Sequence, residues 1–570
     1  MQQQSQEPDG FEQAIALYGE GRLREAEAAC HAALKAEPRQ PHALHMLGLI
    51  RAEAGAVEEG LALVEQALAT GVVHPAIQAA HGRLLLRLGR PAGAVPSLEQ
   101  SLRLDPRQPP VLRLLGVALI QTGRAADAEA LLRGALARLP EDPGLLDALA
   151  MSAMAQGRYA EARPLLERAL ELDPEQPDAA GNLALVYEQS NLLDEAAKIV
   201  EQGLERWPKH ASLQLIEARL LRRRGDYAAG RERLLALQQR RELLPMLQRD
   251  SEFELGWCAD GLGDFDKAME HFGTAKELTL KFASPSPELR KAYPQLLAEL
   301  TAILASRPAA VGTAEAPAGT PAFLLGFPRS GTTLLDTMLG AHGGFTVLEE
   351  QPAIRDMLDA YRAAGHAYPG TRLEPDAGTR ARMREAYFEA CRRAGWDGKR
   401  ALLDKSPFAT AHLGAIYAVF PGAPIVFLAR HPCDVVLSCY MNAFELNSGT
   451  VHFTRLESTV DLYCGIMDLW RLYREKLPLN HLVVRYEDLV AAPEAELRRL
   501  LEFLKQPWSP AVLEYAEHAL KRGRIPTPSY SQVSRPLYRH ASGRWRNYST
   551  YLEPYRARLA PYIEAFGYEP

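Results

Sequence analysis

The chain has 570 residues, too many for a single hydrophobic core, so we expect at least two domains. With 47% hydrophobic residues, 24% charged residues and a net charge of −6, it has an ordinary globular composition and no basic excess, so nucleic acid is not an expected partner. It offers no run of about 20 apolar residues for a membrane span and no secretory signal in its N-terminal stretch MQQQSQEPDGFEQ, so we expect a cytoplasmic protein.

The first half of the chain carries a 34-residue spacing in three registers. Prolines stand at Pro38, Pro106, Pro140, Pro174 and Pro208. Glycines stand at Gly21, Gly55, Gly89, Gly123, Gly157 and Gly225, with Asn191 in the remaining slot. Small residues follow five positions later, at Ala26, Gly60, Ala94, Ala128, Ala162, Ala196 and Gly230. Such regular spacing predicts an array of structural repeats.

Each register has a physical role in a helix–turn–helix unit. Glycine or asparagine adopts the left-handed conformation that ends the first helix. The small residue lets the second helix approach its partner, and proline stops that second helix. The pattern resembles the tetratricopeptide repeat, whose length is 34 residues. A final unit has the same spacing at Gly263 and Ala268, four residues late, so we expect about eight units over residues 7–284.

Arrays of this type stack into a superhelix with a concave binding face. We therefore expect a partner, or a protein or peptide substrate, to dock on the repeats. A scaffold or dimerisation surface is the alternative, and it leaves the oligomeric state open. Residues 285–320 then join the two halves. An amphipathic helix is expected over 286–306, and an Ala-, Pro- and Gly-rich linker follows over 307–322.

From residue 321 to 570 strands alternate with helices, which predicts an α/β domain with a P-loop-like parallel sheet. The first strand, 322–326, runs into the loop FPRSGTT and then a helix. Backbone N–H groups of such a loop and the helix dipole bind anions. The predicted binding residues of this loop are Arg329, Ser330, Gly331, Thr332 and Thr333.

The loop differs from a nucleoside-triphosphate P-loop at one informative position. Thr332 stands where a kinase has the lysine that reaches the β- and γ-phosphates. This disfavours a P-loop kinase and favours a donor with a 5′-phosphate and a sulfuryl group. A second anion site is predicted at Arg430, which ends a buried strand, and Ser438, which lies on the next helix. Two anion sites suit a donor phosphorylated at both the 5′ and 3′ positions.

These motifs resemble those of sulfotransferases that use 3′-phosphoadenosine 5′-phosphosulfate. The resemblance covers about residues 321–550 and points to the tyrosylprotein sulfotransferase branch and to bacterial repeat-linked sulfotransferases. It implies Glu350 of VLEEQP as the general base, and Lys405 and Ser529 as stabilisers of charge on the leaving nucleotide. It also implies donor binding by Tyr486, Arg535 and Arg544.

The implied acceptor is a protein or peptide tyrosine, and a small phenol, a saccharide or a lipid is the alternative. Gln351 and Pro352 stand where the tyrosylprotein branch has arginines, which weakens the case for a strictly acidic peptide motif. No metal is expected, since no metal-ligand spacing occurs and this family needs none. A non-catalytic adaptor that uses the repeats alone is a further alternative.

Three residues near the predicted base allow other interpretations. Glu350 could cap the following helix, with Glu349 as the base instead. His342 is a further candidate base, since another sulfotransferase branch uses a histidine, although its position at a helix end favours capping. Lys405 could lie at the surface, but its place directly after an apolar run argues against that.

Overall fold

A computed structural model of the chain describes residues 10–240, 243–308, 316–317, 319–370, 374–516 and 542–569. Two of the predicted site residues, Ser529 and Arg535, lie outside these ranges, as does half of the predicted linker. The chain divides into two compact units, Met1–Ser251 and Glu252–Pro570. Within the described ranges no helix combines the length and apolarity needed to cross a membrane.

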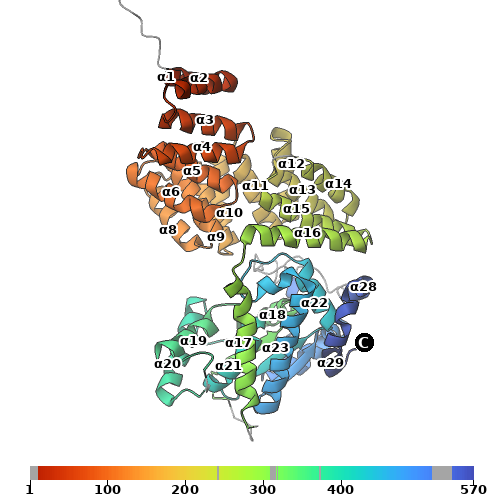
Figure 1. The fold of residues 1–570 in the computed structure, drawn as a ribbon. Helices are drawn as coiled ribbons and strands as arrows, with labels where there is room; N and C mark the ends of the chain where they lie inside the picture. Colours follow the sequence, from red (N-terminus) through yellow and green to blue (C-terminus); the bar gives the residue numbers. More distant parts are fainter. Residues whose placement is uncertain are drawn as a thin grey trace, which may run out of the picture. The chain divides into compact units, whose positions relative to one another are not determined.

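The first unit is all-α, and its helices pack as successive pairs (Figure 1). They are α1 (Gly10–Gly19), α2 (Leu23–Ala36), α3 (Pro41–Glu53), α4 (Val57–Ala69), α5 (Pro75–Arg87), α6 (Pro91–Leu104), α7 (Pro109–Gln121), α8 (Ala125–Leu136), α9 (Pro143–Ala155), α10 (Tyr159–Leu172), α11 (Pro177–Gln189), α12 (Leu193–Arg206), α13 (Ala211–Arg223) and α14 (Tyr227–Gln238). The next helix, α15 (Pro245–Gly261), crosses the division between the units.

The predicted repeat features have the expected conformations. Every glycine of the 34-residue register has a positive φ, and Asn191, which fills the remaining slot, has a φ of 59°. The small residues sit where two helices touch. At Gly60, for example, an added Cβ would lie 2.4 Å from the carbonyl oxygen of Gly48 in the partner helix. The helix–turn–helix repeats predicted from the spacing are therefore confirmed.

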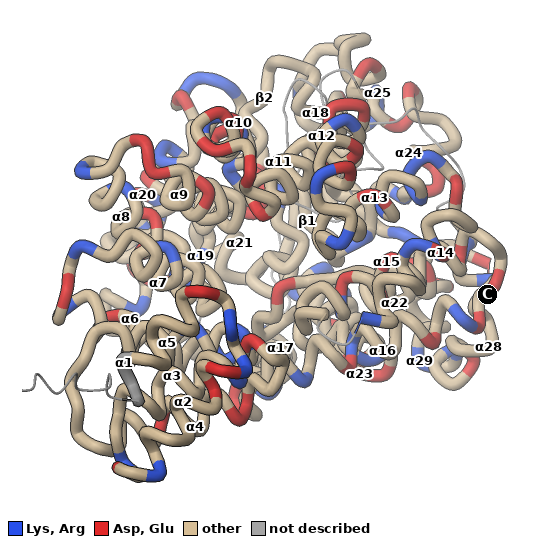
Figure 2. Tube along the Cα trace, turned by 90° about the horizontal axis from the view of Figure 1, so that it is seen from above, with Lys and Arg blue, Asp and Glu red and all other residues tan. Residues whose placement is uncertain are grey.

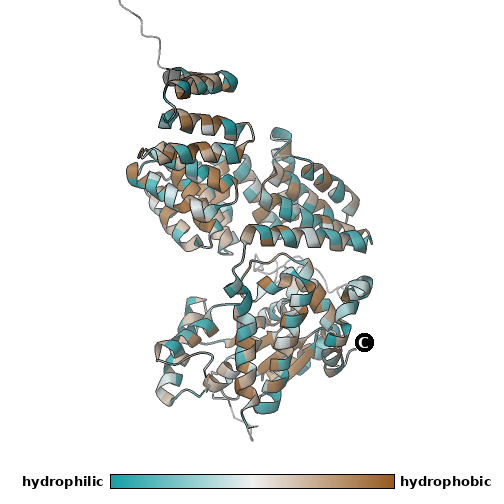
Figure 3. Ribbon diagram, in the orientation of Figure 1, coloured by the Kyte–Doolittle hydropathy of each residue, from teal (hydrophilic) through white to brown (hydrophobic). Residues whose placement is uncertain are grey.

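The helices of the first unit are amphipathic, as packing against neighbours on one side requires. In Figure 3 brown, apolar residues alternate with teal, polar ones along each helix. Residues of both charge signs are interspersed along the repeats in Figure 2, with no large region of one sign. This distribution agrees with the near-neutral composition.

The second unit is built around a five-stranded parallel sheet of order β2-β3-β1-β4-β5. The strands are β1 (Ala322–Gly326), β2 (Phe345–Glu349), β3 (Ala401–Lys405), β4 (Ile425–Ala429) and β5 (His481–Arg485). β1 and β4 are buried along their whole length, as their continuous apolar sequences predict. The strand 322–326 therefore has the predicted bounds, and Arg430 directly follows β4.

Helices cover the sheet and complete the second unit. They are α16 (Phe265–Ala283), α17 (Pro287–Ala305), α18 (Thr332–Ala341), α19 (Ala353–Ala363), α20 (Ala377–Arg393), α21 (Leu413–Val419), α22 (Pro432–Met441), α23 (Leu456–Lys476), α24 (Tyr486–Ala491), α25 (Pro493–Phe503), α28 (Ser549–Leu552) and α29 (Arg556–Ala565). Short 3₁₀ turns are η1 (Pro407–His412), η2 (Thr450–Thr454), η3 (Pro510–Leu513), η5 (Arg544–Tyr548) and η6 (Glu553–Tyr555).

The helices expected to form the last repeat and the connecting segment pack within this second unit. Lys276 on α16 donates a hydrogen bond from Nζ to the carbonyl oxygen of Asn442 at 2.7 Å. Tyr293 on α17 donates from its hydroxyl to the carbonyl oxygen of Phe408 at 3.2 Å. The second unit thus includes helices that precede the sulfotransferase-like motifs in the sequence.

Candidate active site

The loop that follows β1 has the form of an anion cradle. Arg329 and Gly331 both have a positive φ, of 70° and 102°, and Gly331 directly precedes the N-terminus of α18. A Cβ at Gly331 would lie 2.4 Å from Cδ2 of Tyr486, so only glycine fits there. The Ser330 hydroxyl oxygen is buried, and none of the described residues forms a hydrogen bond with it. A buried hydroxyl of this kind suits a bound oxyanion.

The first turn of α18 supplies the two threonines of the motif. Thr332 and Thr333 are 4% and 5% exposed. At the other end of the loop, Thr410 of η1 fixes the end of β1, because its hydroxyl lies 3.1 Å from the Gly326 amide nitrogen and 2.7 Å from the Gly326 carbonyl oxygen. The loop is therefore anchored on both sides.

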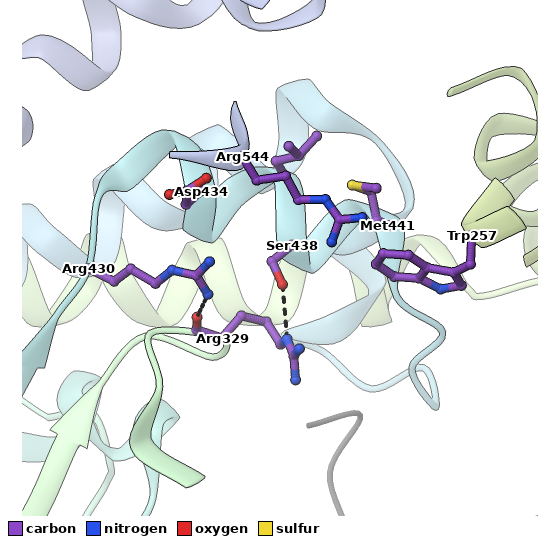
Figure 4. A pocket seen from close by; sticks show the side chains of 8 residues that line it. Trp257, Arg329, Arg430, Asp434, Ser438, Met441 and Arg544 are labelled. Carbon is purple, nitrogen blue, oxygen red and sulfur yellow. Dashed lines mark hydrogen bonds between the residues drawn. The ribbon is translucent and has the colours of Figure 1, made fainter. Parts of the chain in front are cut away.

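Three guanidinium groups meet beside this loop in one pocket (Figure 4). Arg329 donates from Nε to the Ser438 hydroxyl at 3.1 Å, and Arg430 donates from Nη1 to the Arg329 carbonyl oxygen at 2.9 Å. The lining residues are Trp257, Arg329, Arg430, Asp434, Leu437, Ser438, Met441 and Arg544. Four predicted donor-binding residues thus share one pocket, which three arginines and one aspartate line.

Tyr486 supports two parts of this region. Its ring lies 4.9 Å from the guanidinium carbon of Arg430 and closely approaches Gly331. Burial raises the pKa of Tyr486, and the Arg430 charge opposes that rise. The phenol therefore stays neutral near pH 7 and acts as a packing platform for the arginine.

A charged cluster lies at the carboxyl ends of β2 and β3, next to β1. Lys405 is fully buried, and its Nζ lies 2.8 Å from Glu349 Oε1, 3.0 Å from Glu350 Oε1 and 3.4 Å from Asp336 Oδ2. Burial alone would lower the pKa of Lys405, but the charges of Glu349, Asp336 and Glu350 outweigh it and raise that pKa above its usual value. The amine is therefore a permanent cation shared among three carboxylates.

The two adjacent glutamates of this cluster differ in accessibility. The Glu350 side chain is 50% exposed, whereas that of Glu349 is 4% exposed. Glu350 also has a positive φ of 51° and directly follows β2, while the N-cap position of α19 is occupied by Pro352. Of the two carboxylates, Glu350 is thus the one that is accessible from solvent.

His342 lies at the C-terminal end of α18, where its ring is fixed by the backbone. Its Nε2 lies 2.8 Å from the Pro507 carbonyl oxygen, and its Nδ1 accepts from the Gly344 amide at 3.2 Å. Both ring nitrogens are therefore occupied by backbone groups outside α18, and it is the backbone N–H of His342 that bonds to that helix, at the Leu339 carbonyl oxygen.

Some residues of the site were not anticipated from the motifs. Asp434 accepts hydrogen bonds from the Gly543 and Trp545 amides, at 2.7 and 2.8 Å, and so holds the backbone around Arg544. An acidic residue inside the apolar helix sequence HPCDVVLSC was a usable signal for it. Trp257 of α15 had no comparable signal, because it reaches the pocket from a distant part of the sequence.

Comparison with known proteins agrees with both halves of this description. Residues 321–510 match the sulfotransferase family model, and residues 11–71, 85–151 and 153–220 match tetratricopeptide repeat models. An uncharacterized protein of Aquifex aeolicus is 30% identical over 249 residues, which are 42% of this chain and 32% of that protein. Protein-tyrosine sulfotransferase 1 of Danio rerio is 29% identical over 269 residues, which are 44% of this chain and 72% of that protein.

The nodulation protein NoeE of Sinorhizobium fredii is 29% identical over 224 residues, which are 34% of this chain and 51% of that protein. The chain thus spans from about a third to about three quarters of the relatives it matches. In the solved structures, a tetratricopeptide repeat protein of Parabacteroides merdae aligns with a TM-score of 0.37 at 18% identity, over 42% of this chain and 97% of that one. The family models thus identify tetratricopeptide repeats and a sulfotransferase domain in this chain.

Proposed function

We propose that the protein transfers a sulfuryl group from 3′-phosphoadenosine 5′-phosphosulfate to an acceptor hydroxyl. One observation carries the proposal: an anion-binding loop, a three-arginine pocket and a lysine–carboxylate cluster lie at the carboxyl ends of neighbouring parallel strands. Ligands of open α/β sheets bind at that edge. The match to the sulfotransferase family model supports the same reaction.

The two anion-binding elements suit the two ends of the donor. The loop after β1, with its buried Ser330 hydroxyl, suits the 5′-phosphosulfate. Arg430, Ser438 and Arg544 suit the 3′-phosphate, because planar guanidinium groups match phosphate oxygens in pairs. Thr332 stands where a P-loop kinase has its phosphate-binding lysine, which is consistent with a bound group of lower charge than a triphosphate.

Glu350 is the proposed general base. In the transfer, the acceptor oxygen forms a bond to sulfur and its proton passes to the Glu350 carboxylate. The bond between sulfur and the bridging oxygen breaks, and its electron pair leaves with adenosine 3′,5′-bisphosphate. Lys405 holds the base through its 3.0 Å contact, and its positive charge offsets the charge that develops on the leaving oxygen. Ser529 and Arg535 lie outside the described residues, and the proposal keeps for them the roles that the resemblance implies: Ser529 stabilises the leaving nucleotide, and Arg535 binds the donor.

A protein or peptide tyrosine is the proposed acceptor, since several relatives are named protein-tyrosine sulfotransferases. The repeats, which commonly bind protein segments, offer a surface on which the acceptor docks. Arg355, the basic residue nearest after Glu350, has a side chain 71% exposed and 3.5 Å from Asp356. We therefore expect less dependence on acidic residues around the target tyrosine than a strictly acidic motif would impose.

Transfer of radiolabelled sulfate from the donor into a cell lysate, catalysed by the purified full-length protein, tests this proposal. Glu350→Gln is expected to lower the labelling roughly 100-fold or more, the usual contribution of a general base. Glu389→Gln, on the exposed face of α20, serves as the matched control and should label like the unaltered protein.

The outcomes separate the alternatives. Label on protein tyrosine, lost with Glu350→Gln, supports the full proposal. If only small molecules are labelled, the proposed sulfuryl transfer stands and the tyrosine acceptor is overturned. Labelling that Glu350→Gln leaves unchanged contradicts the assigned base. Tighter binding of ATP than of adenosine 3′,5′-bisphosphate would identify a kinase instead.

A further inference from the structure

The pocket beside Ser438 contains a side chain from helix α15. This helix is the first of the last repeat-like helix pair, α15 and α16. Trp257 of α15 lines the pocket together with Arg329, Arg430 and Arg544 (Figure 4). α15 is packed tightly on α16, since an added Cβ at Gly256 would lie 2.6 Å from the ring of Phe272. A helix outside the strand–helix alternation thus reaches the predicted donor site.

The same helix holds Arg544 through an ion pair. Arg544 donates from Nε to Asp260 Oδ1 at 3.1 Å, and its Nη2 pairs with Asp260 Oδ2. The Arg544 guanidinium carbon lies 4.7 Å from the ring centre of Trp257. The Tyr548 hydroxyl donates to Asp260 Oδ1 at 2.6 Å and fixes the carboxylate in turn. Arg544 is therefore oriented by two hydrogen bonds on one edge and an aromatic ring on its face.

This arrangement leaves the arginine able to bind an anion. A guanidinium has five N–H donors, and the pair with Asp260 uses two of them. Within the described ranges, no residue accepts a hydrogen bond from Nη1 of Arg544. The backbone on both sides is held as well, because Asp434 accepts from the Gly543 and Trp545 amides. The side chain is thus fixed in place before a ligand arrives, which lowers the entropic cost of binding.

We infer that Asp260 and Trp257 are positioning residues that hold Arg544 for the 3′-phosphate of the donor. This inference rests on the proposed function and deepens it. The assignment to the 3′-phosphate follows from the neighbours of Arg544, which lines the pocket with Ser438 and Arg430, whereas the 5′ end of the donor is assigned to the loop around Ser330. Part of the donor site is then built by α15, so the sulfotransferase-like motifs alone do not complete it.

Calorimetric titration of the full-length protein with two nucleotides tests the inference. Adenosine 3′,5′-bisphosphate carries the 3′-phosphate, and adenosine 5′-monophosphate lacks it. Asp260→Asn is expected to weaken bisphosphate binding about tenfold, as for loss of one charge-assisted hydrogen bond. Monophosphate binding should change less than about twofold. Trp257→Ala, which removes the aromatic face and leaves the ion pair, should weaken only bisphosphate binding, about threefold.

A control and a double variant separate positioning from general stabilisation. Asp266→Asn removes a similar contact, since the Tyr551 hydroxyl donates to Asp266 Oδ1 at 2.8 Å outside the pocket, and should leave both affinities unchanged. Once Arg544→Ala is present, adding Asp260→Asn should cause no further loss, because Asp260 acts through Arg544.

Three results would overturn the inference: equal losses for both nucleotides, no loss with either Asp260→Asn or Trp257→Ala, or additive losses in the double variant. Failure of the unaltered protein to bind the bisphosphate is a different result, because it would overturn the proposed function itself.

Discussion

The two units of the molecule use long-range contacts over very different sequence distances. In the repeats, the buried ion pair of Arg223 with Glu188 joins residues 35 positions apart, about one repeat length. In the second unit, Lys405 contacts Glu349 over 56 positions, and Arg544 contacts Asp260 over 284. Contacts in the repeats thus join residues about one repeat apart, whereas contacts in the candidate site depend on how strands and helices far apart in the sequence pack together. Paired substitutions, one in each unit, test this difference.

The largest effects are expected from removing a buried cation in each unit. Arg223 is 2% and Lys405 0% exposed in the side chain. Removing one partner of a buried ion pair costs about 3–5 kcal/mol of folding free energy. We expect Lys405→Met to be the more damaging, because it leaves Glu349, Glu350 and Asp336 together, whereas Arg223→Met leaves Glu188 within 3.7 Å of Arg219.

Hydrogen exchange read by mass spectrometry locates these losses in each unit, and the sulfate assay measures their effect on function. Lys405→Met should abolish transfer at temperatures where the protein remains folded. Arg223→Met should increase exchange in the repeats and leave donor binding intact. If Arg223→Met abolished donor binding, the functional separation of the two units would be wrong.

Two glycines with positive φ give a second, smaller contrast. Gly89 ends a repeat helix with a φ of 68° and has no atom within 4 Å of an added Cβ, whereas the Cβ of an alanine at 331 would collide with Tyr486. Gly89→Ala should cost only the backbone strain, about 1 kcal/mol, with no change in transfer. Gly331→Ala displaces the anion-binding loop and should lower transfer roughly 100-fold.

Thermal unfolding and the sulfate assay check both variants. Equal activity of Gly331→Ala and the unaltered protein would mean that the loop after β1 does not bind the donor. A loss of transfer in Gly89→Ala would instead show that the repeat conformation controls the reaction.

The smallest expected effect is a difference in how stability depends on pH. Burial raises the pKa of Asp404 in β3 to about 7, against a hydrogen bond from Tyr387 and the charge of Lys405, which both lower it. Burial likewise raises the pKa of Asp147 in α9 to about 6, against a hydrogen bond from Asn182. In the unfolded chain the pKa of each of these carboxyl groups is near 4. Between that pH and the pKa in the folded state, the folded protein therefore binds more protons than the unfolded chain does.

Stability contributed by these groups is therefore present at low pH and is lost as the pH rises. The decline, at most about 1.4 kcal/mol per pH unit for each group, should end near pH 6 in the repeats and near pH 7 in the second unit. Urea unfolding between pH 5 and 8 measures it, with hydrogen exchange assigning it to each unit. Asp404→Asn should remove the decline in stability between pH 6 and 7. An unchanged pH profile in that variant would refute the assignment of this decline to Asp404.

The repeat fold was predictable because each unit repeats the same local signals. Three signals can be recognised in the sequence alone: glycine or Asn191 at the turn, a small residue at the helix contact, and proline after the second helix. The strands were predictable for a similar reason, since β1 and β4 are continuous apolar runs. Both the repeats and the parallel sheet therefore follow from patterns that span a few tens of residues.

The site was only partly predictable. The motifs identified Arg329, Arg430 and Ser438, which the fold brings into one pocket because β1 and β4 are neighbours in the sheet. The contacts of Arg544 with Asp260 and Trp257 follow no local pattern. They depend on the packing of α15 in the second unit, which the sequence motifs do not encode.

A crystal structure of the protein with adenosine 3′,5′-bisphosphate tests the central claim most directly. We predict the 5′-phosphate on backbone N–H groups of residues 329–333, and the 3′-phosphate within hydrogen-bonding distance of Arg430, Ser438 and Arg544. Arg544 should keep its pair with Asp260 in that complex. A nucleotide bound elsewhere, or bound with its 3′-phosphate away from these three side chains, would contradict the assignment of the donor site and with it the proposed reaction.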